Sequence, residues 1–232
     1  MVSEIYERAV DPLQYDREDI CWEKEIELRP LTRNLFFDSL KKYDSKWVNA
    51  DVLDIGCGNG WLMDLLIKDK ARSVEGLEPS KKNIILLKKE FPHLDIINCD
   101  FQSFETEKKY DLITGVMVFT HFSDLDSVFR KIYNLLKEDG ELHAIIPDYE
   151  YTKKQRKDYE ILIEELNEDE YVIQIKKDFG VIADIVRKVE VYEKTGKKNG
   201  MMLMDNVGVS CSKRLKDGGN EVIFHLLRFK KF

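Results

Sequence analysis

The stretch Asp51-Val-Leu-Asp-Ile-Gly-Cys-Gly-Asn-Gly60 decides the fold of this chain. A short apolar strand ends in Asp54, three alternate glycines follow, and the apolar segment 61–67 predicts a helix. Glycine allows a sharp turn with positive φ and lets a ligand approach the main chain without meeting a Cβ atom. Exposed N–H groups at the start of a helix favour a polar ligand. The pattern therefore predicts a ligand cradle, and a tight strand-to-helix turn without a ligand is the alternative.

Two further predicted strands end in polar residues downstream of the glycines. The apolar run 74–77 is followed by Glu78-Pro79-Ser80, and an acidic residue about 20 positions beyond such a loop can accept both hydrogen bonds of a ribose diol. The run 94–98 is followed by Cys99-Asp100-Phe101, whose carboxylate and aromatic ring are suited to a purine. Ligands bind beyond the carboxyl ends of parallel strands, so these segments predict one shared site.

The order of these motifs resembles the class I S-adenosylmethionine-dependent methyltransferase family. Residues 110–122, Tyr-Asp-Leu-Ile-Thr-Gly-Val-Met-Val-Phe-Thr-His-Phe, are similar to that family's fourth-strand motif, and residues 135–142 to its turn into strand five. The likeness covers about residues 48–148. A nicotinamide-binding Rossmann protein would more usually show G-x-G-x-x-G, whereas this loop continues with Trp61, so a dehydrogenase is disfavoured. The resemblance implies S-adenosyl-L-methionine as cofactor and S-adenosyl-L-homocysteine as product.

The resemblance also implies where the cofactor binds. The implied residues lie in the glycine loop and at the ends of strands two, three and four, and they are Asp54, Gly56, Cys57, Gly58, Gly60, Glu78, Pro79, Ser80, Asp100, Phe101, Val116 and Met117. The four cysteines are widely separated and form no C-x-x-C pair, so neither a metal site nor a disulfide framework is expected.

Three residues are candidates for the chemical step, because a hydroxyl or ammonium acceptor must lose a proton before or during methyl transfer. His121 follows strand four and either takes that proton or braces the loop. Asp148 and Tyr149 emerge from the carboxyl end of strand five, where the acceptor is expected, and either of them would orient or deprotonate it. Positioning alone can supply much of the catalysis, since favourable effective molarities correspond to about 7 to 11 kcal/mol.

Strand and helix signals alternate from residue 52 to residue 147, which predicts βα units, a parallel sheet and right-handed crossovers. Met201–Ser210 and Glu221–Phe229 predict two closing strands. By the family resemblance they form the antiparallel addition at the sheet edge. The expected class is α/β, with a doubly wound, seven-stranded, mostly parallel sheet and a C-terminal antiparallel hairpin.

The remaining segments are expected to surround this core in a single domain, 1–232. Residues 1–47 predict helices at 19–27 and 31–43, which would form a lid. The family resemblance implies that such a segment covers the cofactor and supplies an aromatic residue, for which the candidates are Tyr6, Tyr15 and Trp22; packing against the sheet is the alternative. Residues 48–148 are the cofactor-binding core, and 149–195 are a cap inserted between strands five and six. In the cap we expect a charged helix at 149–167, a hairpin with strands 171–176 and 181–186, and a helix at 187–194. Residues 196–232 supply the closing strands.

Composition narrows the class of protein. The 232 residues are 43% hydrophobic and contain no apolar run of membrane-spanning length, and the acidic N-terminus lacks a signal-peptide pattern, so a cytoplasmic enzyme is expected. The net charge is −7, and residues 1–150 hold 20 basic against 30 acidic side chains, which argues against a nucleic-acid groove. The basic cluster 153–157 is either a solvated helix face or a contact for an anionic substrate.

The sequence thus favours a methyltransferase that acts on an oxygen or nitrogen of a small molecule, such as a sugar or a secondary-metabolite intermediate. One alternative is methylation of a protein or of RNA, which needs a wider groove with basic or stacking residues. A second alternative is a regulatory protein that binds S-adenosylmethionine without turnover. No membrane partner is expected, and the expected state is a monomer or a homodimer.

Overall fold

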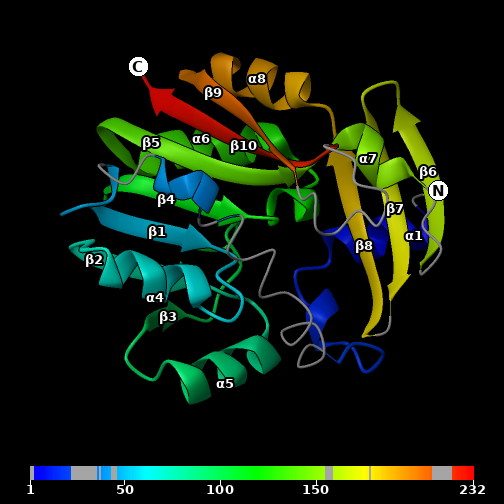
Figure 1. The fold of residues 1–232 in the computed structure, drawn as a ribbon, viewed down its shortest axis with the longest axis horizontal. Helices are drawn as coiled ribbons and strands as arrows, with labels where there is room; N and C mark the ends of the chain where they lie inside the picture. Colours follow the sequence, from blue (N-terminus) through cyan, green and yellow to red (C-terminus); the bar gives the residue numbers. More distant parts are fainter. Residues whose placement is uncertain are drawn as a thin grey trace.

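Two β-sheets organise the molecule (Figure 1). The structure is a computed structural model, and it describes residues 3–21, 36, 38–42, 46–154, 159–177, 179–210 and 221–232. The strands of the larger sheet are β1 Asp51–Ile55, β2 Ser73–Leu77, β3 Asp95–Ile97, β4 Tyr110–Val116, β5 Leu136–Pro147, β9 Met201–Ser210 and β10 Val222–Lys231. Their order is β3-β2-β1-β4-β5-β10-β9. Strands β1 to β5 are parallel, whereas β10 is antiparallel to both β5 and β9, so the predicted fold class is confirmed.

Helices cover both faces of the larger sheet, because each buried strand is apolar on both sides. These helices are α4 Trp61–Lys68, α5 Lys81–Glu90, α6 Leu125–Leu135 and α8 Val189–Lys198. Neighbouring residues of a strand point to opposite faces. Leu53 and Ile113 therefore pack with α6 and α8, while Val52 and Leu112 pack with α4 and α5. Each face thereby forms its own hydrophobic cluster.

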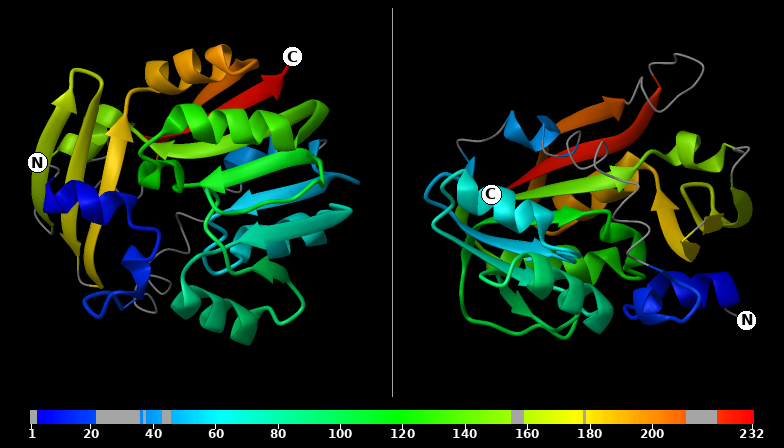
Figure 2. Two further views of the ribbon diagram at one scale, coloured as in Figure 1. Left: turned by 180° about the vertical axis from the view of Figure 1, so that it is seen from behind. Right: turned by 60° about the horizontal axis from the view of Figure 1, so that its bottom comes forward.

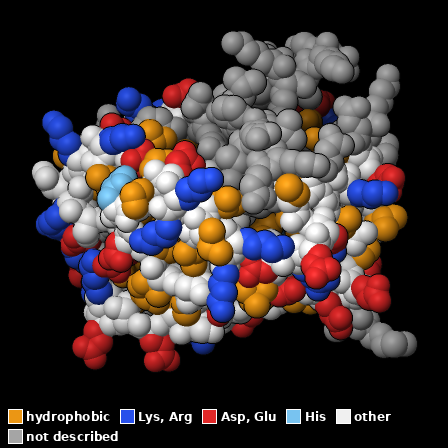
Figure 3. Space-filling view, turned by 90° about the horizontal axis from the view of Figure 1, so that it is seen from below, with side chains coloured by type: hydrophobic (Ala, Val, Ile, Leu, Met, Phe, Trp, Pro, Cys, Tyr) orange, Lys and Arg blue, Asp and Glu red, His pale blue; other side chains and the backbone are white. Residues whose placement is uncertain are grey.

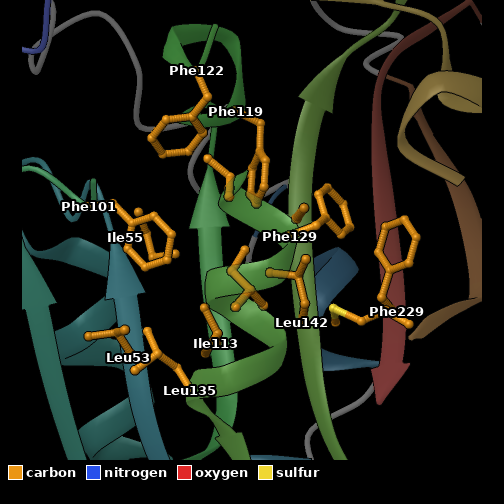
Figure 4. Packing of buried hydrophobic residues seen from close by; sticks show 14 of the residues in the cluster. Leu53, Ile55, Phe101, Ile113, Phe119, Phe122, Phe129, Leu135, Leu142 and Phe229 are labelled. Carbon is orange, nitrogen blue, oxygen red and sulfur yellow. The ribbon is translucent and has the colours of Figure 1, made fainter. Parts of the chain in front are cut away.

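The sequence of α6 shows how one helix is specified. Its buried residues are three or four positions apart and face the sheet, and they are Leu125, Val128, Phe129, Ile132 and Leu135. Asp124 caps the helix, since its Oδ1 accepts a hydrogen bond from the N–H of Ser127 at 3.1 Å. Figure 4 shows Phe129 between Phe119 of the loop after β4 and Phe229 of β10. This packing fixes the end of β4 against the sheet.

The smaller sheet lies beside the carboxyl ends of the larger sheet's parallel strands (Figures 1 and 2). Its antiparallel strands are β6 Glu160–Asn167, β7 Glu170–Lys177 and β8 Gly180–Arg187. The adjoining short helices are α1 Glu4–Val10, η1 Gln14–Asp16, η3 Phe119–His121 and α7 Tyr149–Lys153. Helix α1 packs Ala9 against Val172 and Ile185 on one face, whereas Tyr149 and Tyr171 are buried on the other. The predicted hairpin of the cap is confirmed as β7 and β8.

The predicted helix at 149–167 is wrong beyond its first turn. Among the described residues of this stretch, the helix α7 ends at Lys153, and β6 occupies residues 160–167 as the outer strand of the smaller sheet. The apolar residues of this stretch also fit a helical spacing, but pairing with β7 decides the conformation. In that register Glu160 lies opposite Lys176, and Lys176 Nζ is 3.1 Å from Glu160 Oε1. Residues 155–158, which include most of the basic cluster, lie outside the described residues.

The predicted N-terminal helices also need correction. Helix α1 occupies residues 4–10 and the turn η1 residues 14–16, where no helix is predicted, and residues 19–21 are not helical. The N–H of Cys21 instead donates to the carbonyl of Phe179 at 2.7 Å, beside the smaller sheet. Residues 22–35, which include Trp22 and the rest of the predicted helix at 19–27, lie outside the described residues. Residues 36 and 38–41 are helical, in agreement with the second predicted helix.

A buried arginine joins the two sheets. The Arg187 guanidinium is 3% exposed, and it donates to Glu170 Oε1 at 2.7 Å and to the carbonyl of Phe122 at 2.8 Å. We expect Arg187→Ala to lower the free energy of unfolding by about 3 to 5 kcal/mol, because the partners lose a buried charged donor. Chemical denaturation measures this change. Arg130→Ala is the control, since the exposed pair Arg130–Asp126 is expected to contribute less than about 1 kcal/mol; equal losses would contradict the role of Arg187.

Candidate functional site

The glycine loop connects β1 to α4, and its three glycines have different roles. All three have positive φ, at +65° for Gly56, +56° for Gly58 and +77° for Gly60. A Cβ atom on Gly56 would lie 2.7 Å from Val118 Cγ2, and one on Gly60 would lie 2.7 Å from Leu94 Cδ1. At Gly58 a Cβ atom would meet nothing within 4 Å. Close packing therefore requires two of the glycines, whereas Gly58 faces open space.

Glu78 holds the glycine loop from the end of β2. The residue is 4% exposed, and its Oε2 accepts the N–H of Gly58 at 2.8 Å. Oε1 accepts the N–H of Ser80 at 2.9 Å and the Asn83 amide at 3.2 Å. Burial raises the pKa of Glu78 to about 7, and these hydrogen bonds oppose the rise. The predicted ribose-binding acid therefore lies directly against the predicted cradle.

A second buried carboxylate lies at the end of β1. Asp54 is 3% exposed, and its Oδ1 accepts the hydroxyl of Thr114 on β4 at 2.7 Å. Burial raises the pKa of Asp54 to about 7, the bond from Thr114 opposes this shift, and the charge of Glu78 adds to it. Two acidic groups in one buried site favour a ligand that carries positive charge.

Both carboxylates line one pocket at the carboxyl ends of the parallel strands. Its lining includes ten of the twelve predicted cofactor residues: Asp54, Gly56, Cys57, Gly58, Glu78, Pro79, Asp100, Phe101, Val116 and Met117. The other two predicted residues do not line the pocket: Gly60 directly precedes α4, and Ser80 caps the N-terminus of α5. Some further lining residues belong to the N-terminal segment, residues 3–21, and they are Val10, Asp11, Pro12 and Tyr15. Others are Phe36, Asn59 and Trp61.

His121 joins the N-terminal segment to the pocket. Its Nε2 is 3.2 Å from the Tyr15 hydroxyl, and its Nδ1 is 3.2 Å from the carbonyl of Ala9. The carboxylate of Asp184, on β8, lies 3.8 Å from Nδ1. Both His121 and Tyr15 line the pocket, so the structure brings the predicted base and one of the predicted lid aromatics together. Tyr6 instead belongs to α1 and packs against the smaller sheet.

The other two catalytic candidates have partners outside the pocket lining. Asp148 caps α7, since Oδ1 accepts the N–H of Tyr151 at 2.6 Å, and its Oδ2 is 2.9 Å from His225 Nε2. Tyr149 packs against the ring of Tyr171 with centroids 4.9 Å apart, and Tyr171 donates its hydroxyl to the Tyr149 carbonyl. These contacts anchor the smaller sheet. Catalytic roles for Asp148 and Tyr149 stay predictions.

Sequence reasoning missed the contacts of the turn η1. Gln14 is fully buried, and its amide donates to the carbonyl of Ala183 at 3.3 Å and accepts the N–H of Ala183 at 3.2 Å. Asp16 binds the start of α5 through the hydroxyl of Ser80 at 2.6 Å. No local signal predicts these pairs, because the partners are far apart in the chain. The place of Trp61 in the pocket lining could have been predicted, because it is the aromatic residue that directly follows the glycines.

The raised pKa of Asp54 predicts a specific pH dependence of stability. Its folded pKa of about 7 exceeds the ordinary value of 3.8, so its stabilising effect is complete below pH 3.8 and is lost as pH rises towards and through 7. We expect Asp54→Asn to gain at least about 1 kcal/mol of stability relative to the wild type between pH 5 and pH 8. Urea denaturation at each pH measures this difference. Parallel curves for the two proteins would contradict a raised pKa at Asp54.

Two other features are absent from the described part of the chain. Among these residues, no helix has both the length and the apolar character needed to cross a membrane. Within the same residues, no group of three or more His, Cys, Asp or Glu side chains is placed to hold a metal ion.

The chain is similar to known methyltransferases in sequence and in fold. A family model described as "Methyltransferase domain" matches residues 26–168. The ubiquinone biosynthesis O-methyltransferase of Pelagibacter ubique is 31% identical over 120 residues, which are 50% of each chain, so this chain spans about half the length of the curated relatives it matches.

Solved structures extend the similarity of fold over almost the whole chain. The PH0226 protein of Pyrococcus horikoshii aligns over 99% of both chains with a TM-score of 0.69 and 19% identity. The glycopeptide N-methyltransferase MtfA, complexed with S-adenosyl-L-homocysteine, aligns over 84% of this chain and 89% of its own with a TM-score of 0.63 and 11% identity. The family match covers more than half of the chain and contains the glycine loop, Glu78 and Asp100, and this chain therefore belongs to the methyltransferase-domain family.

Proposed function

We propose that this protein is an S-adenosylmethionine-dependent methyltransferase that methylates an oxygen or nitrogen of a small molecule. One observation carries the proposal: Glu78 and the open face of Gly58 share a pocket wall with Asp54, and Tyr15 and His121 line the same pocket. The motifs of the cofactor half and the groups suited to an acceptor thus meet in one place. The family match supports the class of reaction.

The residues of the pocket fit this cofactor. The missing side chain of Gly58 leaves room for a ligand beside the main chain. Glu78 presents a carboxylate, the group suited to a ribose diol, and the buried Nδ2 of Asn59 lacks a hydrogen-bond partner within the described protein. Asp54 adds negative charge for a cationic ligand. Asp100 and Phe101 lie at the end of β3, where they would hold the base.

When bound, S-adenosylmethionine supplies a methyl group on a positively charged sulfur atom. The side chains of the pocket would orient the acceptor and manage its proton. The amide nitrogen of Gln14 and the carbonyl of Ala9 both lie near His121 Nδ1, at 3.1 Å and 3.2 Å. If Nδ1–H donates to the Ala9 carbonyl, the one lone pair of Nε2 accepts the hydroxyl of Tyr15. Tyr15 would then orient an acceptor hydroxyl or amine, and as its oxygen takes the acceptor's proton it would pass its own proton to Nε2. The N-terminal segment over the pocket would exclude water.

A small acceptor is favoured over a protein or RNA because of how charge is arranged. Figure 3 shows a face on which basic and acidic side chains are interspersed. In the basic cluster, Lys153 pairs with Glu165 at 2.9 Å and Lys154 pairs with Glu221. These lysines are neutralised by neighbours on the protein, which weakens the case for an anionic substrate there. We also propose that residues 1–232 form a single domain, in which residues 1–47 are the lid and residues 149–195 are the cap.

Calorimetric titration tests the cofactor. We expect micromolar binding of S-adenosylmethionine and S-adenosylhomocysteine, and no binding of NAD or ATP at the same concentrations. Methyl transfer is then followed from labelled S-adenosylmethionine into three pools: a small-molecule cell extract, total RNA and total protein. Label in the small-molecule pool supports the proposal. Label only in RNA or protein would select that alternative, and binding without transfer would select a regulatory protein.

Once an acceptor is known, two variants identify the base. We expect His121→Ala to lower kcat by about 100-fold while S-adenosylmethionine affinity changes by less than about threefold. Asp148→Asn is the comparison, because its carboxylate caps α7 and contacts His225. We expect it to retain kcat within about threefold. The reverse result would assign the proton transfer to Asp148, and full turnover in both variants would exclude both residues as the base.

A further inference from the structure

The three residues of η1 contact three different parts of the molecule. Gln14 bonds to the edge of β8, Tyr15 contacts His121, and Asp16 binds Ser80 at the start of α5. Figure 2 shows this N-terminal segment, in blue, running from the smaller sheet towards the larger one. One turn of chain thus connects the smaller sheet, the loop after β4 and a cofactor-side helix.

Asp16 occupies the N-terminus of α5. Its Oδ1 accepts the hydroxyl of Ser80 at 2.6 Å and the N–H of Lys82 at 3.2 Å. Its Oδ2 accepts the N–H of Lys81 at 3.2 Å. These N–H groups have no partner within the helix, and negative charge is stabilised at a helix N-terminus. Lys82 Nζ also donates to the carbonyl of Arg17 at 2.8 Å, so the helix holds the segment at two adjacent residues.

The turn that Asp16 binds is the turn that orients Glu78. Ser80 donates its N–H to Glu78 Oε1 at 2.9 Å, and its hydroxyl oxygen accepts the N–H of Asn83 at 3.1 Å. The Asn83 side chain donates to the same Glu78 oxygen at 3.2 Å. Asp16 fixes the direction of the Ser80 hydroxyl and thereby the geometry of this network. Asp16 is therefore connected to the carboxylate beside Gly58 through one residue, Ser80, whose hydroxyl binds Asp16 and whose backbone N–H binds Glu78.

The same segment covers the pocket, which Val10, Asp11, Pro12 and Tyr15 line. We propose that Asp16 is a positioning residue for ligand retention: by binding Ser80 it fastens this segment over the pocket and holds Glu78 in place, so that a bound ligand leaves only when the contact opens. This inference rests on the proposed function. It adds to that function a residue that acts on the pocket through Ser80.

Asp16→Ala tests the inference, with Asp19→Ala as the matched control. Asp19 belongs to the same segment, but its partner is Arg8 at 2.9 Å rather than α5. In Asp16→Ala we expect S-adenosylhomocysteine to dissociate about tenfold faster or more, whereas Asp19→Ala retains the wild-type rate. We also expect faster hydrogen exchange at the amides of residues 80–83 in ligand-free Asp16→Ala. Unchanged dissociation and unchanged exchange in this variant would overturn the inference.

A double-mutant cycle with Ser80→Ala separates a shared contact from two independent effects. If Asp16 acts through Ser80, the double variant releases S-adenosylhomocysteine at nearly the rate of Ser80→Ala alone. Additive effects of the two substitutions would overturn the proposed route. If the wild type binds neither S-adenosylmethionine nor S-adenosylhomocysteine, the proposed function fails. Exchange at residues 80–83 in the ligand-free proteins still decides whether Asp16 fastens the turn.

Discussion

Glu78→Ala is expected to weaken S-adenosylmethionine binding by about 100-fold or more. The substitution removes the carboxylate that would bind the ribose diol, and each hydrogen bond to a charged group contributes about 1.5 to 3 kcal/mol. It also releases the N–H of Gly58, which Oε2 holds at 2.8 Å, so the glycine loop loses a fixed partner. Calorimetric titration of the purified variant measures the affinity directly.

Two further variants separate binding from folding. Glu75→Ala removes a carboxylate from the same strand, but this side chain accepts the hydroxyl of Tyr110 at 2.7 Å and pairs with Lys108. Its cofactor affinity is expected to stay near the wild-type value. Glu78→Gln keeps the size of the side chain and is expected to lose about tenfold in affinity with a folded pocket. Wild-type affinity in both Glu78 variants would refute the assignment of Glu78 as the ribose-binding acid.

Gly58→Arg is expected to abolish detectable cofactor binding, a loss of more than about 1,000-fold in affinity, while the protein remains folded. A Cβ atom at this position meets nothing within 4 Å, so the long side chain enters the pocket instead of the core. The positive φ of +56° adds a conformational cost of about 1 to 2 kcal/mol for a residue with a side chain. Titration and thermal unfolding are measured on the same preparation.

The pair Gly58→Ala and Gly60→Ala provides the matched comparison. Both substitutions add one methyl group at a residue with positive φ, but a Cβ atom on Gly60 would lie 2.7 Å from Leu94 Cδ1 and 2.9 Å from Leu87 Cγ. We expect Gly60→Ala to lose more stability, by about 1 kcal/mol or more, and Gly58→Ala to lose more affinity. The opposite order would show that Gly58 supports the core and that Gly60 faces the ligand.

The cofactor half of the site was predictable because its residues follow consecutive strands. Asp54, Glu78 and Asp100 each stand at a strand end, and parallel pairing necessarily brings those ends to one edge of the sheet. Ten of the twelve predicted residues line the pocket for this reason. The two closing strands could also be predicted from the sequence, because β9 and β10 alternate in burial along much of their length.

The contacts of the N-terminal segment and the smaller sheet were not predictable in the same way. Asp16 and Ser80 are 64 residues apart, and nothing in either local sequence marks the partner. Strand β6 exposes most of its side chains, so burial gives its sequence little period, and its pairing with β7 decides its conformation. Sequence patterns report the faces that an element buries, whereas side-chain bonds between distant segments leave no periodic signal.

The bonds between Gln14 and the backbone of β8 also affect the order in which the contacts of the molecule form. Gln14 and Ala183 are 169 residues apart, so the bonds between them close a very long loop of chain. During synthesis residue 14 is made early, yet its bonds to Ala183 cannot form until residue 183 has left the ribosome, and the other partner of its side chain, His121, is 107 residues away. Contacts of such separation form slowly because loop closure must precede any gain from the contact. Tyr15 follows Gln14 directly and contacts His121, which is 106 residues away, so we expect the wall that it gives to the pocket to form late in a newly made chain.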